Sequence, residues 1–267
     1  MKIMRRVFLL ALCLVPCTGF AQAAENQYQP TVGQEGKDVV WVPTPAVLVE
    51  KMLDMAQVTP RDFVMDLGSG DGRNIIAAAK RGARALGVEY NADMVEYSKR
   101  IAAKEGVTDR AQFVQGDMYD ADISQATVLA LFLLPENLNK LTPKFLDLRP
   151  GTRIVANHFG IEGWDPDETG KSDGDCGSWC TALLYIVPAR VAGAWRLGKG
   201  ELELEQKFQK LAGTLTVAGV KTPVGNGRLL GDRITFSAGG VRYAGRVDGD
   251  AMRGDNGAWS ASRVRPE

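Results

Sequence analysis

The chain has 267 residues, of which 45% are hydrophobic and 24% charged, and its 32 basic residues balance its 32 acidic residues. This balance gives no support for a nucleic acid partner, because phosphate binding needs a clustered positive surface. After the first two dozen residues the longest apolar run, 126–135, is far shorter than the roughly 20 residues of a transmembrane helix, which excludes a membrane-spanning segment there.

The N-terminus has the features of a secretory signal peptide. Three basic residues precede an apolar stretch at 7–15, and the sequence AQA, which signal peptidase can cut, ends at Ala23. We expect cleavage after Ala23 and a periplasmic or secreted mature chain that is slightly acidic. The Arg5-Arg6 pair leaves both the general secretory route and the twin-arginine route open.

From Thr44 to Phe159 short apolar runs alternate with segments of helical pattern. A first helix is expected at 47–56, after Pro45. The expected strands are 63–67, 85–89, 112–115, 126–134 and 152–157, with helices at 73–80, 93–104 and 137–148 between them. Strands that alternate with helices predict an α/β fold with a parallel sheet and right-handed crossovers.

The first strand ends in Asp66-Leu67 and is followed by GSGDG, which places glycines at 68, 70 and 72. Because glycine has no Cβ, such a turn lets the backbone approach a ligand closely at the carboxyl edge of the sheet. A dinucleotide site would need its third glycine at the position of Arg73, and Asp71 would repel a pyrophosphate there. Asp66 and Asp71 instead suit a ligand that carries positive charge.

Acidic residues also end or follow the next two strands. Glu89 ends the second, and its carboxylate can accept hydrogen bonds from both hydroxyls of a ribose. Asp117 follows the third, where it can accept the amino group of an adenine while Met118 covers the ring. Three acids at successive strand ends around a glycine turn predict a site for S-adenosylmethionine (SAM).

The ends of the fourth and fifth strands carry candidates for acceptor chemistry. Glu136 and Asn137 follow the fourth strand and can either orient an amine or simply begin the next helix. His158 follows the fifth strand and can either accept a proton from the nucleophile or serve as a hydrogen-bonded structural side chain.

Only Cys176 and Cys180 remain after signal cleavage. In an oxidising compartment such a pair predicts a disulfide across a tight loop, with two free thiols as the alternative. A metal site is disfavoured, because two more ligands would be needed and His158 is the only histidine of the chain.

After Pro188 the hydrophobic period changes to two, as in ELELE at 201–205. The pattern predicts an antiparallel β-meander at 189–267, a curled sheet or half-barrel, beside an α/β domain at 24–188. GRLLGDRI at 227–234 resembles GRVDGDAM at 245–252, which is either a repeated hairpin or a chance recurrence. Four aromatic residues form either the core of the meander or anchors for a partner: Trp195, Phe208, Tyr243 and Trp259.

The ordered motifs DLGSGDGR, GVEYN and QGDM resemble those of class I SAM-dependent methyltransferases over about residues 40–160. The resemblance implies the Rossmann-like seven-strand sheet, with the β-meander as an addition, and SAM as cofactor. The cofactor-binding residues expected on this basis are Thr44, Asp66, Gly68, Ser69, Gly70, Asp71, Gly72, Glu89, Asn91, Asp117 and Met118.

A narrower resemblance extends upstream. WVPTPAVLVEKML before the glycine turn is similar to small seven-strand lysine methyltransferases that modify mitochondrial membrane proteins, such as the ATP synthase c subunit and adenine nucleotide carriers. In that group the segment matching 42–45 lies over the cofactor, which implies that Thr44 touches the methionine end. Its alternative role is a helix N-cap before Pro45. The resemblance fades after about Trp164.

Methyl transfer requires a neutral nucleophile held about 3 Å from the methyl group. The sequence after the fourth strand, LLPEN, matches neither the Asp-Pro-Pro-Tyr loop nor the Pro-Cys pair of nucleic acid methyltransferases. The resemblance therefore implies an amine acceptor, on a protein lysine or on a small molecule, and makes Glu136, Asn137 and His158 the catalytic candidates. Because SAM is a cytoplasmic metabolite, export leaves a non-catalytic nucleoside-binding or interaction protein as the alternative.

Overall fold

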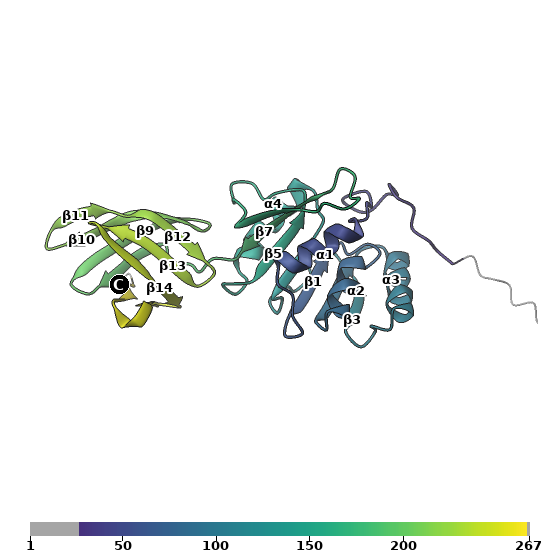
Figure 1. The fold of residues 1–267 in the computed structure, drawn as a ribbon, viewed down its shortest axis with the longest axis horizontal. Helices are drawn as coiled ribbons and strands as arrows, with labels where there is room; N and C mark the ends of the chain where they lie inside the picture. The colour runs from purple at the N-terminus through teal and green to yellow at the C-terminus, as the bar shows by residue number, and fades with distance from the viewer. Residues whose placement is uncertain (1–26, 266–267) are drawn as a thin grey trace, which may run out of the picture.

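A computed structural model describes residues 27–265, which form two β-sheets joined near residue 190 (Figure 1). The signal peptide expected at 1–23 lies outside the described residues. Within 27–265, none of the helices combines the length and the apolar character needed to cross a bilayer.

The first sheet has seven strands in the order β3-β2-β1-β4-β5-β7-β6. Its strands are β1 (Phe63–Leu67), β2 (Arg84–Glu89), β3 (Ala111–Gln115), β4 (Val128–Leu131), β5 (Arg153–Asn157), β6 (Glu168–Lys171) and β7 (Thr181–Ile186). The strands from β1 to β5 pair in parallel, as predicted, whereas β7 runs antiparallel to both β5 and β6. Neither β6 nor β7 was predicted from the sequence pattern. The ETGK segment of β6 is largely exposed and has no apolar alternation.

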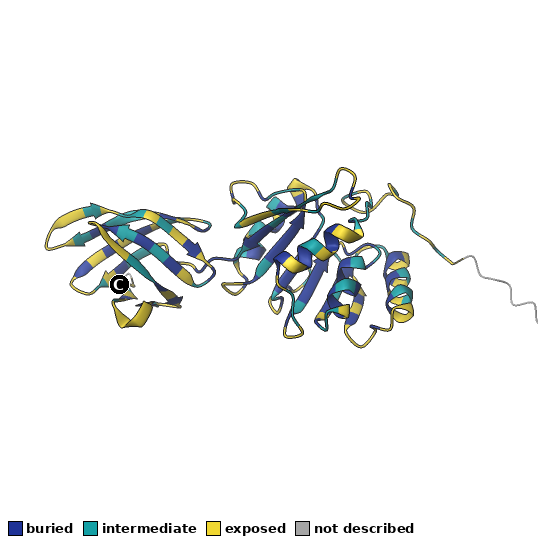
Figure 2. Ribbon diagram, in the orientation of Figure 1, coloured by how far each residue is buried: buried dark blue, intermediate teal, exposed yellow. Residues whose placement is uncertain are grey.

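Four helices cover the two faces of this sheet: α1 (Ala46–Met55), α2 (Arg73–Lys80), α3 (Ala92–Lys104) and α4 (Pro135–Leu146). The first three pack with one set of alternate strand residues, and α4 packs with the other set. Both faces of the central strands are consequently buried (Figure 2). The expected strand at 126–134 is shorter than predicted because α4 begins at Pro135, a residue suited to the first turn of a helix.

The second sheet closes into a barrel. Its elements are β8 (Gly193–Leu197), β9 (Gly200–Lys207), β10 (Lys210–Val217), β11 (Val220–Pro223), β12 (Gly225–Leu230), β13 (Arg233–Ala238), β14 (Val241–Asp248), β15 (Ala251–Gly254), the 3-10 turn η1 (Asp255–Gly257) and β16 (Ser260–Arg263). All the pairings are antiparallel, and β9 pairs with β10 as well as with β8, which closes the ring of strands; β11 pairs only with β10. The predicted curled sheet is therefore a closed one.

The two similar octapeptides form two β-hairpins of the barrel. Gly231 and Gly249 occupy the same place in the turns β12–β13 and β14–β15, with φ of 61° and 57°. Positive φ is readily adopted by glycine, so the recurring Gly-Asp pair serves the same turn twice.

The barrel contacts the first sheet through stacked aromatic rings. Phe208, between β9 and β10, stacks on Trp164 with a centroid separation of 5.1 Å. Beside it, the buried Gln209 amide donates to the Asp165 carbonyl at 2.6 Å. Of the other aromatics, Trp195 is fully buried in the barrel, and Tyr243 and Trp259 pack with Phe236. Trp195, Tyr243 and Trp259 are therefore core residues of the barrel rather than anchors for a partner.

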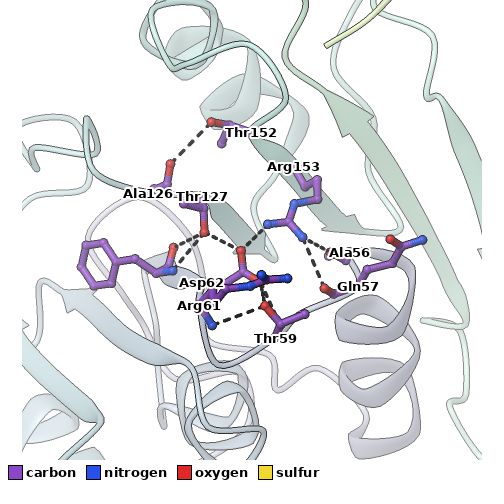
Figure 3. A network of polar contacts seen from close by, with 10 residues as sticks. Ala56, Gln57, Thr59, Arg61, Asp62, Ala126, Thr127, Thr152 and Arg153 are labelled. Carbon is purple, nitrogen blue, oxygen red and sulfur yellow. Dashed lines mark hydrogen bonds and ion pairs between the residues drawn. The ribbon is translucent and has the colours of Figure 1, made fainter. Parts of the chain in front are cut away.

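A polar network ties together the amino ends of three parallel strands (Figure 3). Asp62, just before β1, pairs with Arg153 of β5 and accepts a hydrogen bond from the Thr127 hydroxyl, just before β4, at 2.8 Å. Burial alone would raise the pKa of Asp62, but hydrogen bonds from Thr59 and Thr127 and the charge of Arg153 lower it. The network fixes the strand starts, opposite the carboxyl edge where the candidate site lies.

Candidate cofactor and acceptor site

The glycine turn lies at the carboxyl edge of the first sheet. Its backbone is held by the Val88 carbonyl of β2, which accepts from the N–H groups of Gly68 and Ser69 at 2.8 and 3.0 Å. Gly70 has φ of 54°, and a Cβ there would lie 2.5 Å from Trp41 Nε1. A Cβ at Gly72 would lie 2.5 Å from the ring of Phe113. Gly70 thus allows close approach beside a cavity, whereas Gly72 allows α2 to pack against the sheet.

A cavity of about 230 Å³ lies beside this turn. Its lining includes several of the predicted cofactor residues: Thr44, Asp66, Gly68, Ser69, Gly70 and Asp71. The rest of the lining is mainly apolar. It includes Val42 and Pro43, which were expected to lie over the cofactor, and Trp41, Phe132, Phe159 and Trp179, which were not predicted. The larger cavity, as we call it, therefore has a polar side at the glycine turn and an aromatic side.

A smaller cavity of about 70 Å³ shares Trp41, Gly68 and Leu133 with the larger one. It is lined by Glu89, Asp117 and Met118, which are the residues predicted to bind the nucleoside, and by Asn91, another predicted cofactor-binding residue. Residues 34–39 also line it. The segment before α1 thus covers the carboxyl edge of the sheet, which agrees with the place expected for the residues around Thr44.

Asp66 is the most perturbed acid of the site. Its side chain is almost fully buried, and Asn74 Nδ2 donates to Oδ2 at 2.9 Å, while Oδ1 has no hydrogen-bond partner. Burial, with smaller contributions from the charges of Glu89 and Asp71, raises the pKa of Asp66 to about 7, against the effect of Asn74. A positively charged ligand group in the larger cavity would favour the ionised carboxylate.

Asp71, the second acid expected to face a cation, has a partner of its own. Arg73 Nε donates to Asp71 Oδ1 at 2.9 Å, and Arg73 Nη1 donates to the Thr44 carbonyl at 2.6 Å. The charge of Asp71 is therefore balanced by Arg73, which leaves Asp66 as the acid available to a cationic ligand.

Glu89 is oriented by backbone donors. The N–H of Gly70 donates to Glu89 Oε2 at 2.9 Å, and the N–H of Asn91 donates to Oε1 at 3.0 Å. Asn91 itself caps α3, because its Oδ1 accepts from the N–H of Asp93 at 2.9 Å. The carboxylate is consequently fixed beside the smaller cavity, with lone pairs left for hydroxyl donors.

Asp117 and Met118 follow β3, as the sequence predicts. Asp117 forms an ion pair with Lys37 of the covering segment, and its Oδ1 accepts from the N–H of Tyr119 at 2.9 Å. The hydrogen bond from Lys37 lowers the pKa of Asp117. The Lys37 ammonium also lies 4.9 Å from the ring centre of Tyr90. The acid expected to recognise an adenine amino group is thus held ionised by a cationic side chain.

Thr44 is buried and lines the larger cavity, where its hydroxyl accepts from Asn157 Nδ2 at 3.4 Å. It is not the N-cap of α1, which is Pro45, and no side chain caps that helix. The alternative capping role is therefore wrong.

The three catalytic candidates lie outside the linings of both cavities. Glu136 is exposed in the first turn of α4, and the buried Asn137 donates from Nδ2 to the Tyr119 hydroxyl at 2.8 Å. Both begin a helix, which is the structural role that the sequence left open. His158 is exposed with φ of 63°, and its ring centre lies 5.0 Å from that of Trp179. It borders the aromatic side of the larger cavity.

Three aromatic residues from adjacent strand ends form this side, which we call the aromatic wall: Phe132, Phe159 and Trp179. Phe132 follows β4, Phe159 lies just beyond β5, and Trp179 precedes β7. The ring centres of Phe132 and Trp179 are 5.3 Å apart, and those of Phe159 and Trp179 are 5.8 Å apart. Phe132 and Phe159 could have been predicted to border the site, because each follows an apolar strand. No local sequence pattern predicts this role for Trp179.

The predicted disulfide is confirmed: Cys176 and Cys180 are bonded in the loop between β6 and β7. Across residues 27–265, no group of three His, Cys, Asp or Glu side chains is arranged to hold a metal ion.

The model of the ANTKMT methyltransferase domain family matches residues 66–168. A protein-lysine N-methyltransferase of Saccharolobus islandicus is 44% identical over 153 residues, which cover 56% of this chain and 94% of that protein. The chain therefore belongs to the methyltransferase family that includes this archaeal relative and the ANTKMT methyltransferase domain. A lysine N-methyltransferase of Rattus norvegicus, named for the c subunit of ATP synthase, is 37% identical over 130 residues, or 48% of this chain and 60% of the rat protein.

A solved structure extends the similarity to the cofactor. The crystal structure of an RNA methyltransferase from Salinibacter ruber, in complex with S-adenosyl-L-homocysteine (SAH), is 41% identical with a TM-score of 0.53. The match covers 56% of this chain and 96% of that structure. The protein is thus a SAM-dependent methyltransferase, and the predicted fold, activity and cofactor are confirmed.

The residues of the methyltransferase fit SAM. Asp66 Oδ1 and Ser69 Oγ are buried without hydrogen-bond partners beside the larger cavity, and Gly70 gives close access to the backbone. Asp66 and Ser69 would hold the charged methionine end, whereas Glu89 and Asp117 would hold the nucleoside. When bound, SAM supplies an electrophilic methyl group on a sulfonium.

Proposed function

We propose that the protein is an exported protein-lysine N-methyltransferase. The observation that carries this proposal is the aromatic wall in the cavity that adjoins the glycine turn. A lysine side chain combines a long apolar stem with an amine end, so an apolar and aromatic lining can bury the stem. The aromatic faces also attract a methylated, cationic product. Relatives from an archaeon and a mammal that are named lysine N-methyltransferases support the same acceptor class.

Two features support export. The first 23 residues have the charge, apolar run and cleavage motif of a secretory signal. The chain also holds a disulfide, a bond that persists in oxidising compartments and is rare in the cytoplasm. The proposed organisation is a signal peptide at 1–23, a methyltransferase domain at 24–188 and a barrel domain at 189–267. Fractionated cells should contain a mature chain that starts at Ala24 outside the cytoplasm; a full-length chain found only in the cytoplasm would overturn export.

The acceptor is tested by incubating the mature protein with tritiated SAM and an envelope extract, then separating protein, RNA and low-mass fractions. The expected result is base-resistant label in discrete protein bands that hydrolysis traces to methylated lysine. Label confined to RNA, the acceptor class named for the Salinibacter ruber relative, or to small molecules would overturn lysine. A total absence of label, despite SAM binding, would favour the non-catalytic binding protein. A Gly70→Leu variant provides the background.

A further inference from the structure

The disulfide loop contributes a residue to the acceptor side of the larger cavity. Lys171 of β6 and Thr181 of β7 pair with each other, and residues 172–180 form the loop between them. Of these loop residues, Trp179 lines the cavity. Residues matched by the family model end at 168, so this wall residue lies beyond the matched segment.

Trp179 lies inside the short loop that the cysteine pair closes. Its N–H donates to the carbonyl of Cys176 at 2.9 Å, and its neighbour Cys180 is bonded to Cys176 through sulfur. The Cys180 carbonyl in turn accepts from the N–H of Ser172 at 2.9 Å. Cys176 is buried, whereas the loop residues Asp173 to Asp175 are exposed. The loop sequence SDGDCGSWC therefore has few apolar groups, other than Cys176 and Trp179, that could hold it in place.

We infer that the Cys176–Cys180 disulfide positions Trp179 to complete the acceptor site, so that oxidation of the pair raises the affinity for an alkylammonium side chain. This inference rests on the proposed lysine acceptor and adds redox control to it. The reduced loop has more conformations than the crosslinked one, so ordering it around a ligand costs more conformational entropy. The disulfide lowers this entropy cost because it restricts the loop before the ligand binds. Oxidation converts the two cysteine thiols to one disulfide. The two electrons and two protons pass to an oxidising disulfide, such as oxidised glutathione in vitro, which is reduced to two thiols.

Direct binding to the SAH-loaded full mature chain tests the inference. The probe is n-pentylammonium, which carries the stem and the charge of lysine, and 1-pentanol is the uncharged control. Protein labelled with 5-fluorotryptophan gives a fluorine resonance for each tryptophan, and the Trp179→Phe variant assigns that of Trp179. The Trp259 resonance is an internal control, because Trp259 lies in the barrel with Phe236 and Tyr243.

We expect the probe to shift the Trp179 resonance of the oxidised protein and to bind at least fivefold more weakly to dithiothreitol-reduced protein and to the Cys176→Ser/Cys180→Ser variant. SAH affinity should be unchanged in all forms, which shows that each is folded. Ser178→Ala is the matched control, since Ser178 is exposed in the same loop and the change keeps the disulfide. It should bind the probe like the wild type.

Equal probe affinity in oxidised, reduced and double-serine protein would overturn the inference, as would a Trp179 resonance that does not move. Those results, together with tritium found in protein lysine, would leave the proposed function standing. Redox-dependent probe binding with tritium found only in RNA would support the alkylammonium site and overturn lysine as the acceptor.

Discussion

Asn74 Nδ2 lies 2.9 Å from Asp66 Oδ2 and donates the one side-chain hydrogen bond that this buried carboxylate receives, while Asp66 Oδ1 has no partner. Asn74 belongs to the first turn of α2 and Asp66 to the end of β1, so the helix that follows the glycine turn supports the acid that precedes it. One donor does not compensate burial, and the pKa of Asp66 is accordingly raised to about 7.

SAM binding should therefore depend on pH. Below pH 7 the Asp66 carboxyl is mainly protonated, and a cationic ligand must displace that proton, so affinity should rise between about pH 6 and 8 and then level off. Calorimetry at pH 6.5, in buffers of different ionisation enthalpy, should detect proton release on binding. Asp66→Asn should weaken binding at least tenfold and remove the pH dependence. A pH-independent affinity in the wild type would contradict the role given to Asp66.

The same group should make the ligand-free protein less stable as pH rises. An acid whose pKa is about 7 in the folded state and about 3.9 unfolded favours folding while protonated, so its contribution is greatest below pH 4 and is lost as pH rises through 7. The Asp66→Asn variant should thus melt at a higher temperature than the wild type at pH 8 without ligand, even though it binds SAM poorly. Thermal denaturation at pH 5 and pH 8 measures this; the gain should be larger at pH 8.

Gly70→Ala should abolish SAM binding through Trp41. A Cβ at this position would lie 2.5 Å from Trp41 Nε1, so the covering segment must move. Gly106→Ala is the matched control, because Gly106 also has positive φ, 69°, but nothing lies within 4 Å of its Cβ. Both changes should cost about 1 kcal/mol of backbone strain, yet only Gly70→Ala should lose affinity in isothermal titration. Equal affinity in the two variants would show that Gly70 does not border the cofactor.

Asp62→Asn should destabilise the fold without affecting SAM. The pKa of Asp62 is lowered in the folded state, so its stabilising effect is present above about pH 3.9 and lost as pH falls below that value. We expect a loss of about 2 kcal/mol at pH 7 in urea denaturation, shrinking towards pH 3. Asp109→Asn is the control, since Asp109 forms an exposed pair with Arg110 at 3.6 Å and should contribute little. Loss of SAM affinity in Asp62→Asn would contradict the separation of this network from the site.

Phe208→Ala should weaken the contact between the barrel and the first sheet. The Phe208 ring stacks on the buried Trp164, and its removal should cost about 3 kcal/mol. Calorimetry should then resolve two unfolding transitions where the wild type shows one. Val220→Ala, at an exposed position of β11, should leave the profile unchanged. A single unshifted transition in Phe208→Ala would show that the two parts are coupled elsewhere.

The sequence alone determined the parallel α/β sheet and the acids at its strand ends. Hydrophobic period is a local property, and parallel strands necessarily bring their carboxyl ends to one edge, so the strand pattern was enough to place Asp66, Glu89 and Asp117 around the glycine turn. The disulfide between Cys176 and Cys180 could also be predicted from the sequence, because the two cysteines are close in the chain and their bonding depends on few neighbours.

Only the tertiary structure decided which of these groups have partners. Lys37 pairs with Asp117 across 80 positions of sequence, a pairing that no local pattern predicts. No local pattern predicts the close approach of Trp41 to Gly70 either. The aromatic wall is equally non-local, because its members come from the ends of β4, β5 and β7. Barrel closure likewise depends on β9 meeting β10 as well as β8. Such contacts depend on how whole elements pack, because side chains distant in sequence meet only after the sheets have formed.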